Sequence, residues 1–470
     1  MLRHLLSLAV CLLGFGIINA QTPAIDVHFG DIHSINRGSS SVLDDAGGVW
    51  FAGTISNGAE GSDDIAIYRI KQSGEILWWH AYGDARNEYV NTIAAGGDGI
   101  LYACGDVRDP ETEDLNAFIM ALDTAGNVIW NQEYGEAATN EEFYQLAIAP
   151  DATILLTGFH SALTGTGNDV LLARYAPDGA LLEDTVFGTD RNEVGMSIVA
   201  LPGGNIFVSG DRQTIDGYYN PIFIKLSSDF NVINDIDLTS PHNSGCKSMH
   251  LNFQGDLYIS GETASFATPE FDVLFIVVDT LGNLVTQTGI PSAGPDAGYD
   301  IVQLPDSTYA VTGFAYNPAK GENDMLLMHI DSSGNEIDRL FFGETGADMG
   351  YDIKVDAIGN CRLSGFHTNA DTTFFSLVIA GFPAQTETEN IASPERFLSI
   401  NPNPITESIC VQTELEVDRV IVYDNLGRRV GDLPKTSGQC FEWNTLLPKG
   451  IYYIQMYTSV GNFTKKIIAG

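Results

Sequence analysis

Apolar residues along most of the chain occur in short runs that end in glycine, and no stretch shows the three-to-four-residue period of an amphipathic helix. β-branched and aromatic residues fill these runs. Polar turn residues such as glycine, asparagine and aspartate separate them. The pattern predicts an all-β fold built from many short strands.

One of these runs recurs at a fixed interval, with spellings such as WFAG, YACG, FVSG and AVTG. Its last residue is Gly53, Gly105, Gly158, Gly210, Gly261, Gly313 and Gly365 in successive copies, at spacings of 52, 53, 52, 51, 52 and 52 residues. Each copy holds four predicted strands, and turns such as DTAGN and DSSGN before the last strand suit a tight hairpin. Four strands repeated about every fifty residues predict a β-propeller with one blade per copy.

The repeats resemble the β-propeller repeats of secreted bacterial proteins, as GNIFVSG at Gly204–Gly210 and NDVLLARY at Asn168–Tyr175 illustrate. The seventh copy stops near Phe382 without its fourth strand, whereas Ala24–Gly30, ahead of the first copy, has the spelling of a fourth strand. A ring left open there would expose two unpaired strand edges. We therefore expect a seven-bladed β-propeller over residues 21–382, with blade seven closed by the N-terminal strand.

The first twenty residues have the pattern of a secretory signal peptide. Arg3 precedes the apolar run Leu5–Ile18, and small residues follow just before Gln21. This run is too short to span a bilayer, and no later stretch is apolar for long enough. We expect residues 1–20 to be removed and the protein to be exported without a transmembrane segment.

Beyond a polar linker at residues 383–394, residues 395–470 contain NPNP, VYDNLGRRV, LPKGIYYIQM and a final KK, in that order. These motifs resemble the C-terminal sorting domain of cargo of the type IX (Por) secretion system. The matching positions are Asn401, Pro402, Asn403, Pro404, Asp424, Gly427, Arg428, Gly450, Tyr452, Lys465 and Lys466. The resemblance implies a small β-sandwich that the type IX translocon and its sorting machinery recognise. It also implies a route through the periplasm of a Gram-negative bacterium to the outer cell surface or the medium. An ordinary sandwich domain with no sorting role is the alternative.

Charge separates the two predicted domains. The chain carries a net charge of −38, yet residues 391–470 hold eight basic and eight acidic residues, so the propeller region carries all of the excess. Such an acidic surface argues against nucleic acid or anionic lipid as a partner, because those ligands need basic residues. Either solubility in a salty medium or binding of a cation or a basic partner could explain it.

The cysteines do not predict a disulfide framework. Cys104, Cys246 and Cys361 are scattered through the propeller region, where we expect small buried apolar residues. Cys410 and Cys440 lie on segments that could be neighbouring strands of the second domain, and both the bridged and the free form stay open.

A column of carboxylates precedes the first strand of five copies, each seventeen residues before the copy's glycine. Its members are Glu88, Glu141, Glu193, Asp296 and Asp348. If they ring the mouth of the channel, they could bind Ca²⁺, which takes several oxygen ligands. Alternatively, each carboxylate bonds its own loop or the adjacent blade. A second column, which includes Asp64 and Asp324, precedes the third strand and is interpreted as bonding loop backbone.

The loops between the second and third strands differ in every copy, whereas the turns on the opposite face are stereotyped. Variation confined to one face marks where specificity lies. The sequence shows no catalytic motif and no cofactor motif. His160 and His367 follow their glycines by two residues and are interpreted as exposed loop histidines.

The leading hypothesis is therefore a binding module that contacts a protein or glycan through its acidic top face. Two alternatives remain: an extracellular hydrolase or lyase acting on polysaccharide or peptide through an acid pair, and a scaffold or adhesin without a small ligand. Two carboxylates in one cleft, one of them with a strongly raised pKa, would favour the enzyme.

Overall fold

The computed structural model describes residues 25–469 with the exception of 33–39, 44–47, 57–62, 72–73, 110–113, 137, 163–166, 202, 239–242, 253–254, 265–269, 280, 293, 344, 357–358, 370–371, 383–397, 402–408, 414–416, 425–428, 434, 438–439, 444–449 and 459–460. The predicted signal peptide and the predicted linker lie outside these residues. Strands make up nearly all of the described regular structure. No described segment is a helix with the length and apolarity needed to cross a membrane.

Strands β1 to β28 form five four-stranded sheets and one eight-stranded sheet that joins two four-stranded units. The early strands are β1 (Ile25–Ile32), β2 (Ser40–Leu43), β3 (Val49–Ser56), β4 (Asp63–Ile70), β5 (Ile76–Tyr82), β6 (Asn87–Ala95), β7 (Leu101–Arg108), β8 (Leu115–Leu122) and β9 (Val128–Tyr134), with a short 3₁₀ turn at Gly97–Gly99. The middle strands are β10 (Thr139–Ile148), β11 (Ile154–Ala162), β12 (Asn168–Tyr175), β13 (Leu181–Phe187), β14 (Glu193–Ala200), β15 (Ile206–Gln213), β16 (Tyr219–Leu226), β17 (Val232–Asp237), β18 (Ser244–Leu251), β19 (Leu257–Ala264), β20 (Phe271–Val278) and β21 (Leu284–Ile290). The late strands are β22 (Asp296–Gln303), β23 (Tyr309–Asn317), β24 (Glu322–Ile330), β25 (Glu336–Phe342), β26 (Met349–Val355), β27 (Cys361–Asn369) and β28 (Thr372–Ala380).

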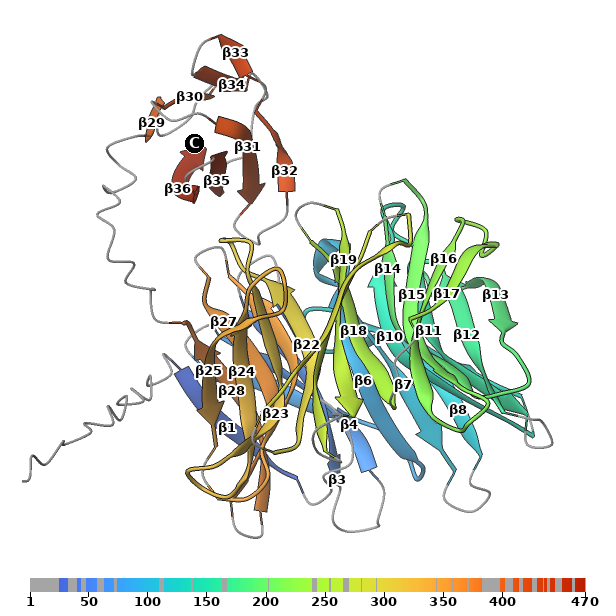
Figure 1. Cartoon of the computed structure of the whole chain (residues 1–470). Coiled ribbons are helices and arrows are strands. Elements are labelled where there is room, and N and C mark those ends of the chain that lie inside the picture. The colour runs from blue at the N-terminus through green and yellow to red at the C-terminus, as the bar shows by residue number, and fades with distance from the viewer. Residues whose placement is uncertain are drawn as a thin grey trace, which may run out of the picture.

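Each four-stranded unit is an antiparallel meander, and the units follow one another around an axis (Figure 1). The first strands β2, β6, β10, β14, β18, β22 and β26 each contact the first strand of the next unit, and β26 contacts β2. This radial arrangement is a β-propeller, as the repeat predicts.

Burial follows the distance of a strand from the axis. Every described residue of β4 is buried, because its two faces pack on neighbouring sheets. The outermost strand β5 is mostly exposed, and Trp79 keeps half of its surface in contact with solvent. The core is therefore a series of layers between adjacent sheets, in which the expected small residues Cys104, Cys246 and Cys361 are buried.

The N-terminal strand β1 pairs antiparallel with β28, and Phe29 lies opposite Phe375 (Figure 1). The Phe29 ring contacts the rings of Phe51 and Tyr68 edge-on, at centroid distances of 4.9 and 4.8 Å. Strand β1 therefore joins the sheet of β26, β27 and β28 and packs on the sheet of β3 and β4.

The hairpin turns have the predicted chemistry. Asp123 Oδ1 accepts the N–H groups of Ala125 and Asn127 at 2.8 and 2.9 Å, and Gly126 has φ +82°. The same bonds recur at Asp279 and Asp331. The aspartate fixes the turn and the glycine adopts a backbone angle that other residues rarely take.

The C-terminal region forms two further sheets of four strands each. One has the order β29 (Leu398–Asn401), β30 (Ile409–Thr413), β34 (Cys440–Trp443), β33 (Lys435–Ser437), and the other β32 (Arg429–Asp432), β31 (Val417–Asp424), β35 (Gly450–Thr458), β36 (Gly461–Ala469). Cys410 and Cys440 lie on the neighbouring strands β30 and β34, where Cys410 pairs with Glu442 and Cys440 with Gln412.

Candidate functional site

Six of the described first strands contain a β-bulge, in which one extra residue interrupts the pairing with the second strand. The extra residues, called the bulge row, are Asn91, Tyr144, Met196, Lys247, Tyr299 and Tyr351. A bulge re-aims the side chain that it carries. All six residues line a central cavity of about 610 Å³.

In the six repeats with a described bulge, the glycine that marks the repeat makes room for it. A Cβ atom on Gly105 would lie 1.9 Å from the carbonyl oxygen of Tyr89, and one on Gly158 would lie 1.7 Å from that of Glu142. Both distances are far below van der Waals contact, so only glycine allows the bulged strand to approach this closely. The repeated glycine in the sequence therefore marks the β-bulge that places a side chain in the channel.

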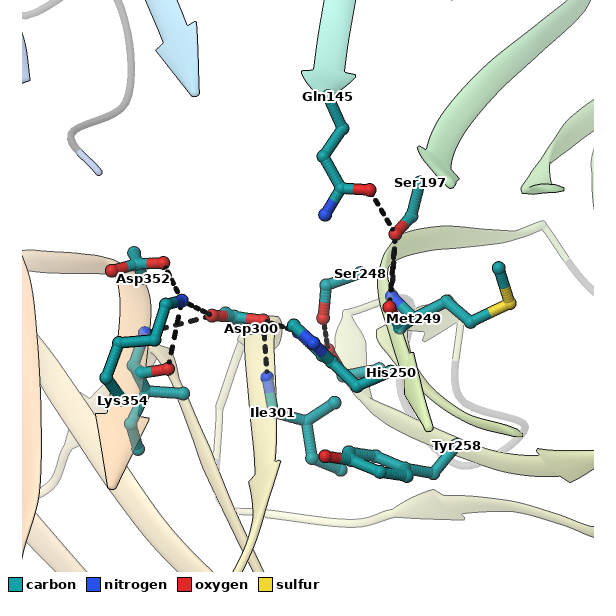
Figure 2. Close-up of polar contacts among 12 residues, drawn as sticks. Gln145, Ser197, Ser248, Met249, His250, Tyr258, Asp300, Ile301, Asp352 and Lys354 are labelled. Carbon is teal, nitrogen blue, oxygen red and sulfur yellow. Dashed lines mark hydrogen bonds and ion pairs between the residues drawn. The ribbon is translucent and has the colours of Figure 1, made fainter. Parts of the chain in front are cut away.

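Beside the bulge row runs a polar belt, one residue from each first strand, made of Ser40, Thr92, Gln145, Ser197, Ser248, Asp300 and Asp352. Members of the belt accept a backbone N–H from the next sheet. Ile198 N donates to Gln145 Oε1 at 2.6 Å. Met249 N donates to Ser197 Oγ at 3.0 Å (Figure 2). Ser41 N likewise donates to Asp352 Oδ2 at 3.0 Å. These bonds satisfy backbone groups that the bulges leave unpaired, and they tie neighbouring sheets together.

Asp300 lies at the centre of the charged part of the belt (Figure 2). His250 Nε2 is 2.7 Å from Asp300 Oδ1, and Lys354 Nζ is 3.4 Å from Asp300 Oδ2 and also pairs with Asp352. Burial alone would raise the pKa of Asp300, but the Lys354 ammonium and His250 outweigh burial and hold this pKa well below its ordinary value. Asp300 is therefore ionised, and it joins β18, β22 and β26.

Three members of the bulge row stack side by side along the channel wall. The rings of Tyr299 and Tyr351 are parallel within 2°, with centroids 5.2 Å apart, and Lys247 Nζ lies 6.0 Å from the centroid of Tyr299. Burial raises the pKa of the Tyr299 hydroxyl to about 12, so it stays protonated and can donate a hydrogen bond. This row presents an aromatic surface edged by hydroxyl and ammonium groups.

The five carboxylates of the predicted cation ring are all buried. Glu141 pairs with His160 at 2.7 Å and Asp296 with Arg339 at 2.8 Å. His160 lies in β11, and His367 lies in β27 and pairs with Asp348 at 2.9 Å, so the interpretation of these two histidines as exposed loop residues is wrong. Only 3% of the His367 side chain is exposed, because β27 holds it between neighbouring strands.

Four of the carboxylates help to form what we call a glycine clamp, in which the glycine after an outer strand lies between two side-chain oxygens. A Cβ atom on Gly83 would lie 2.3 Å from Asp64 Oδ1 and 2.7 Å from Glu88 Oε2. Equivalent clamps surround Gly135, Gly188 and Gly343. The clamp thus joins both acidic columns at the boundary between sheets.

No three of these carboxylates come together. Within the part of the chain that the structure describes, no group of three or more histidine, cysteine, aspartate or glutamate side chains is placed to hold a metal ion. Binding of Ca²⁺ by Glu88, Glu141, Glu193, Asp296 and Asp348 stays a prediction, for which an effect of Ca²⁺ or of a chelator on the melting temperature is the test.

Replacing Glu88 with glutamine should stabilise the protein at alkaline pH. Burial, together with the nearby charge of Asp84, raises the pKa of Glu88 from 4.5 to about 8. A raised pKa contributes stability that is complete below about pH 4.5 and is lost as the pH rises to about 8. Glutamine carries no charge, and its amide can face Asp64 as the amide of Asn116 faces Glu141 at the next clamp. We expect a gain of about 2 kcal/mol at pH 9 relative to pH 5, measured by urea denaturation.

Glu75, which is paired with Lys71 on the surface, provides the control for this experiment. Glu75→Gln should leave the difference between pH 5 and pH 9 unchanged. If Glu88→Gln has the same effect on unfolding at both pH values, the pKa of Glu88 is ordinary and the clamp carries a charge at neutral pH.

Sequence reasoning missed the polar belt and the bulge row. A signal was available, because the residue four positions after each acidic-column residue is polar, as in Asp300, Asp352 and Gln145. The top-face loops, where the sequence places specificity, fall largely outside the described residues. Exposed Tyr218 belongs to the described part of these loops.

The sorting-motif residues lie on four strands of the C-terminal sheets where they are described. Asn401 ends β29, Asp424 ends β31, Gly450 begins β35, and Tyr452 in β35 is buried. Lys465 and Lys466 lie in β36, opposite Ile454 and Tyr453. Pro402, Asn403, Pro404, Gly427 and Arg428 lie outside the described residues.

Comparison with known families shows that residues 399–469 match the secretion system C-terminal sorting domain. The chain is therefore cargo of the type IX secretion system. It interacts with the sorting machinery and is exported to the cell surface or beyond. No match to a characterised protein sequence was found.

Solved structures similar to the chain are β-propellers at low sequence identity. The WD40 domain of Neurospora crassa Pan2 is 11% identical, with coverage of 74% of this chain and 90% of that one and a TM-score of 0.47. The GH93 α-L-arabinofuranosidase of Fusarium graminearum, solved with arabinobiose, is 10% identical, with coverage of 75% and 97% and a TM-score of 0.44. The β-propeller domain of the Trilobed protease from Pyrococcus furiosus is 9% identical, with coverage of 76% and 94% and a TM-score of 0.44.

Proposed function

We propose that this type IX cargo is a ligand-binding protein whose binding site is the central channel of a closed, seven-bladed propeller. In this proposal residues 1–20 are a cleaved signal peptide, residues 21–382 form the propeller, residues 383–394 are a linker, and residues 395–470 form the sorting domain. The mature protein acts at the outer cell surface or in the medium.

Contacts between the two ends of the repeat region support the closed ring. Strand β1 pairs with β28, and β26 contacts β2. The polar belt crosses the same boundary, since the Ser41 N–H and hydroxyl both donate to Asp352 Oδ2 at 3.0 Å. Pairing of this kind would cover the two strand edges that an open ring exposes.

The variation of the bulge row carries the proposal that the channel binds a ligand. The bulge repeats from sheet to sheet, and every described belt position is polar, but the bulge row holds asparagine, tyrosine, methionine and lysine. In a repeat protein, positions that vary within a constant frame set specificity. The cavity of about 610 Å³ also lies within the range of small-ligand sites.

The channel does not supply the acid pair that a hydrolase would need. Asp300 and Asp352 both contact Lys354, so they are close enough to act as a pair. A general acid must hold a proton near neutral pH. Because Lys354 and His250 lower the pKa of Asp300, that carboxyl stays ionised, and within the channel the arrangement suits binding better than hydrolysis.

Filling the cavity tests this function. The full mature chain is screened against glycans, peptides and small metabolites by thermal shift and by pull-down. Met196→Trp, which enlarges a bulge-row residue, should abolish every interaction that depends on the channel. Val285→Trp, at an exposed outer-strand position, is the matched control and should bind normally. If no compound binds, or if Met196→Trp binds as well as the control, the channel is not the site and a scaffold is favoured.

A further inference from the structure

The wall of the channel has two chemically different sides. Strands β18, β22 and β26 contribute Lys247, His250, Tyr299 and Tyr351, together with the charged part of the polar belt. Strands β10 and β14 contribute mainly apolar groups such as those of Met196, Ala147 and Val199. A ligand that fits between them needs a polar edge and an apolar surface on the same small body.

Charged groups in the cavity wall are balanced. The described lining contains two lysines, Lys247 and Lys354, and two aspartates, Asp300 and Asp352. Lys354 contacts both aspartates, and Lys247 Nζ lies 3.1 Å from Glu262 Oε1 outside the lining. An ionic ligand would have to displace one of these internal partners. The cost of removing the ligand's charge from water would then be poorly compensated. The wall therefore favours a neutral ligand, although the whole chain is strongly acidic.

Hydrogen-bonding groups remain directed into the cavity. Gln145 Oε1 accepts from Ser197 Oγ and Ile198 N, which fixes the amide of a residue that lines the cavity and leaves its Nε2 on the side away from Ser197 (Figure 2). His250 lines the same cavity, and its ring contacts Asp300 through Nε2 (Figure 2). Amide and imidazole groups of this kind suit the hydroxyls of a ligand, which both donate and accept.

Aromatic rings provide the complementary apolar surface. Tyr299 and Tyr351 form the stacked pair, and Phe314 and Phe366 lie against the same two rings, at 5.9 and 5.8 Å, and hold them in place. Rigid aromatic side chains give a large contact area at little cost in conformational entropy. A pyranose ring has an apolar C–H face and a rim of hydroxyls, which matches both kinds of surface.

We infer that the channel binds a neutral sugar or a short neutral glycan, with the sugar lying against the Tyr299–Tyr351 pair and its hydroxyls reaching Gln145 and His250. This inference rests on the proposed function and names the ligand class of the same site. Charge balance excludes uronate and sulfated glycans from it, since they would need an uncompensated cation.

Binding of defined oligosaccharides to the full mature chain tests the inference. Cello-, xylo- and manno-oligosaccharides are the neutral probes, and oligouronates and sulfated oligosaccharides are the acidic ones, with titration calorimetry as the measurement. We expect a neutral probe to bind. Tyr299→Ala should weaken it ten-fold or more, whereas Tyr299→Phe, which keeps the ring, should retain most of the affinity. Trp79→Ala removes an exposed aromatic ring outside the cavity and should leave the affinity unchanged.

Three results would overturn the inference. An acidic probe that binds in place of the neutral ones, and is lost in Met196→Trp, would leave the proposed function standing and refute the ligand class. A neutral probe that binds Tyr299→Ala as tightly as the parent chain would refute the placement of the sugar. Failure of every probe while a peptide or metabolite binds in the channel would refute the sugar alone, and failure of all compounds would refute the proposed function itself.

Discussion

Replacing Asp300 with alanine should lower the free energy of unfolding by about 3–5 kcal/mol, the usual cost of removing one partner from a buried ion pair. Only 4% of Asp300 is exposed. The substitution removes one of the two carboxylates that contact Lys354. It also leaves the Ile353 N–H without its acceptor, Asp300 Oδ2, which lies 3.0 Å away. Both effects fall at the contact between β22 and β26, so the whole ring is weakened. Urea denaturation at pH 7 measures the difference.

Asp235 provides the matched control. Its carboxylate lies 2.8 Å from Arg212, but the side chain is 38% exposed, so Asp235→Ala should cost no more than about 1 kcal/mol. Because the pKa of Asp300 is lowered, its contribution is present above about pH 4 and is lost as the pH falls. The difference between the parent chain and Asp300→Ala should therefore shrink in acid. Equal losses for Asp300→Ala and Asp235→Ala would contradict the role given to the charged belt.

The strand pattern and the propeller architecture could be predicted because they depend on local properties of the sequence. Glycine-ended apolar runs, tight turns such as DTAGN and a constant spacing all lie within one repeat. The turn bonds of Asp123 and the burial of the runs follow from these residues without knowledge of distant parts. Because of this local consistency, the fold of a repeat protein can be predicted from its sequence.

The bulges could not be predicted, because each depends on two strands at once. The glycine within a second strand is visible in the sequence, but the carbonyl that occupies the space of its Cβ belongs to the first strand, as Gly105 and Tyr89 show. Without that contact, Tyr299 and Lys247 look like ordinary strand residues. Their position in the channel follows only once the extra residue interrupts the pairing.

The acidic column illustrates a partial prediction. The sequence places the column just before the first strands, and Glu88, Glu141 and Asp296 lie among the first residues of those strands. Their burial depends on partners from other strands, such as His160 opposite Glu141 and Arg339 beside Asp296. A constant spacing reveals that a residue repeats, but it does not reveal whether the side chain faces solvent or the next sheet. Clamp and belt positions keep similar residue types from repeat to repeat and serve the architecture. Bulge-row positions differ in residue type from repeat to repeat.

Replacing Gly343 with alanine should lower the free energy of unfolding by about 4 kcal/mol. Gly343 has φ +150°, and a Cβ atom there would lie 1.8 Å from Asp348 Oδ2. Asp348 is held in place, because it accepts the Thr368 N–H at 2.8 Å and contacts His367 at 2.9 Å. The clash therefore displaces a buried carboxylate in addition to straining the backbone. Chemical denaturation of the full chain measures the loss.

Two comparisons separate the clamp from backbone strain alone. Gly217 has φ +85° with no atom within 4 Å of a built Cβ, so Gly217→Ala should cost only about 1–2 kcal/mol. In the background of Asp348→Ala the clashing oxygen is absent, and Gly343→Ala should then cost about as little as Gly217→Ala. This non-additivity is the signature of direct contact between the two positions. If Gly343→Ala costs the same with and without Asp348, the glycine is required for its backbone angle, and the carboxylate plays no part in selecting it.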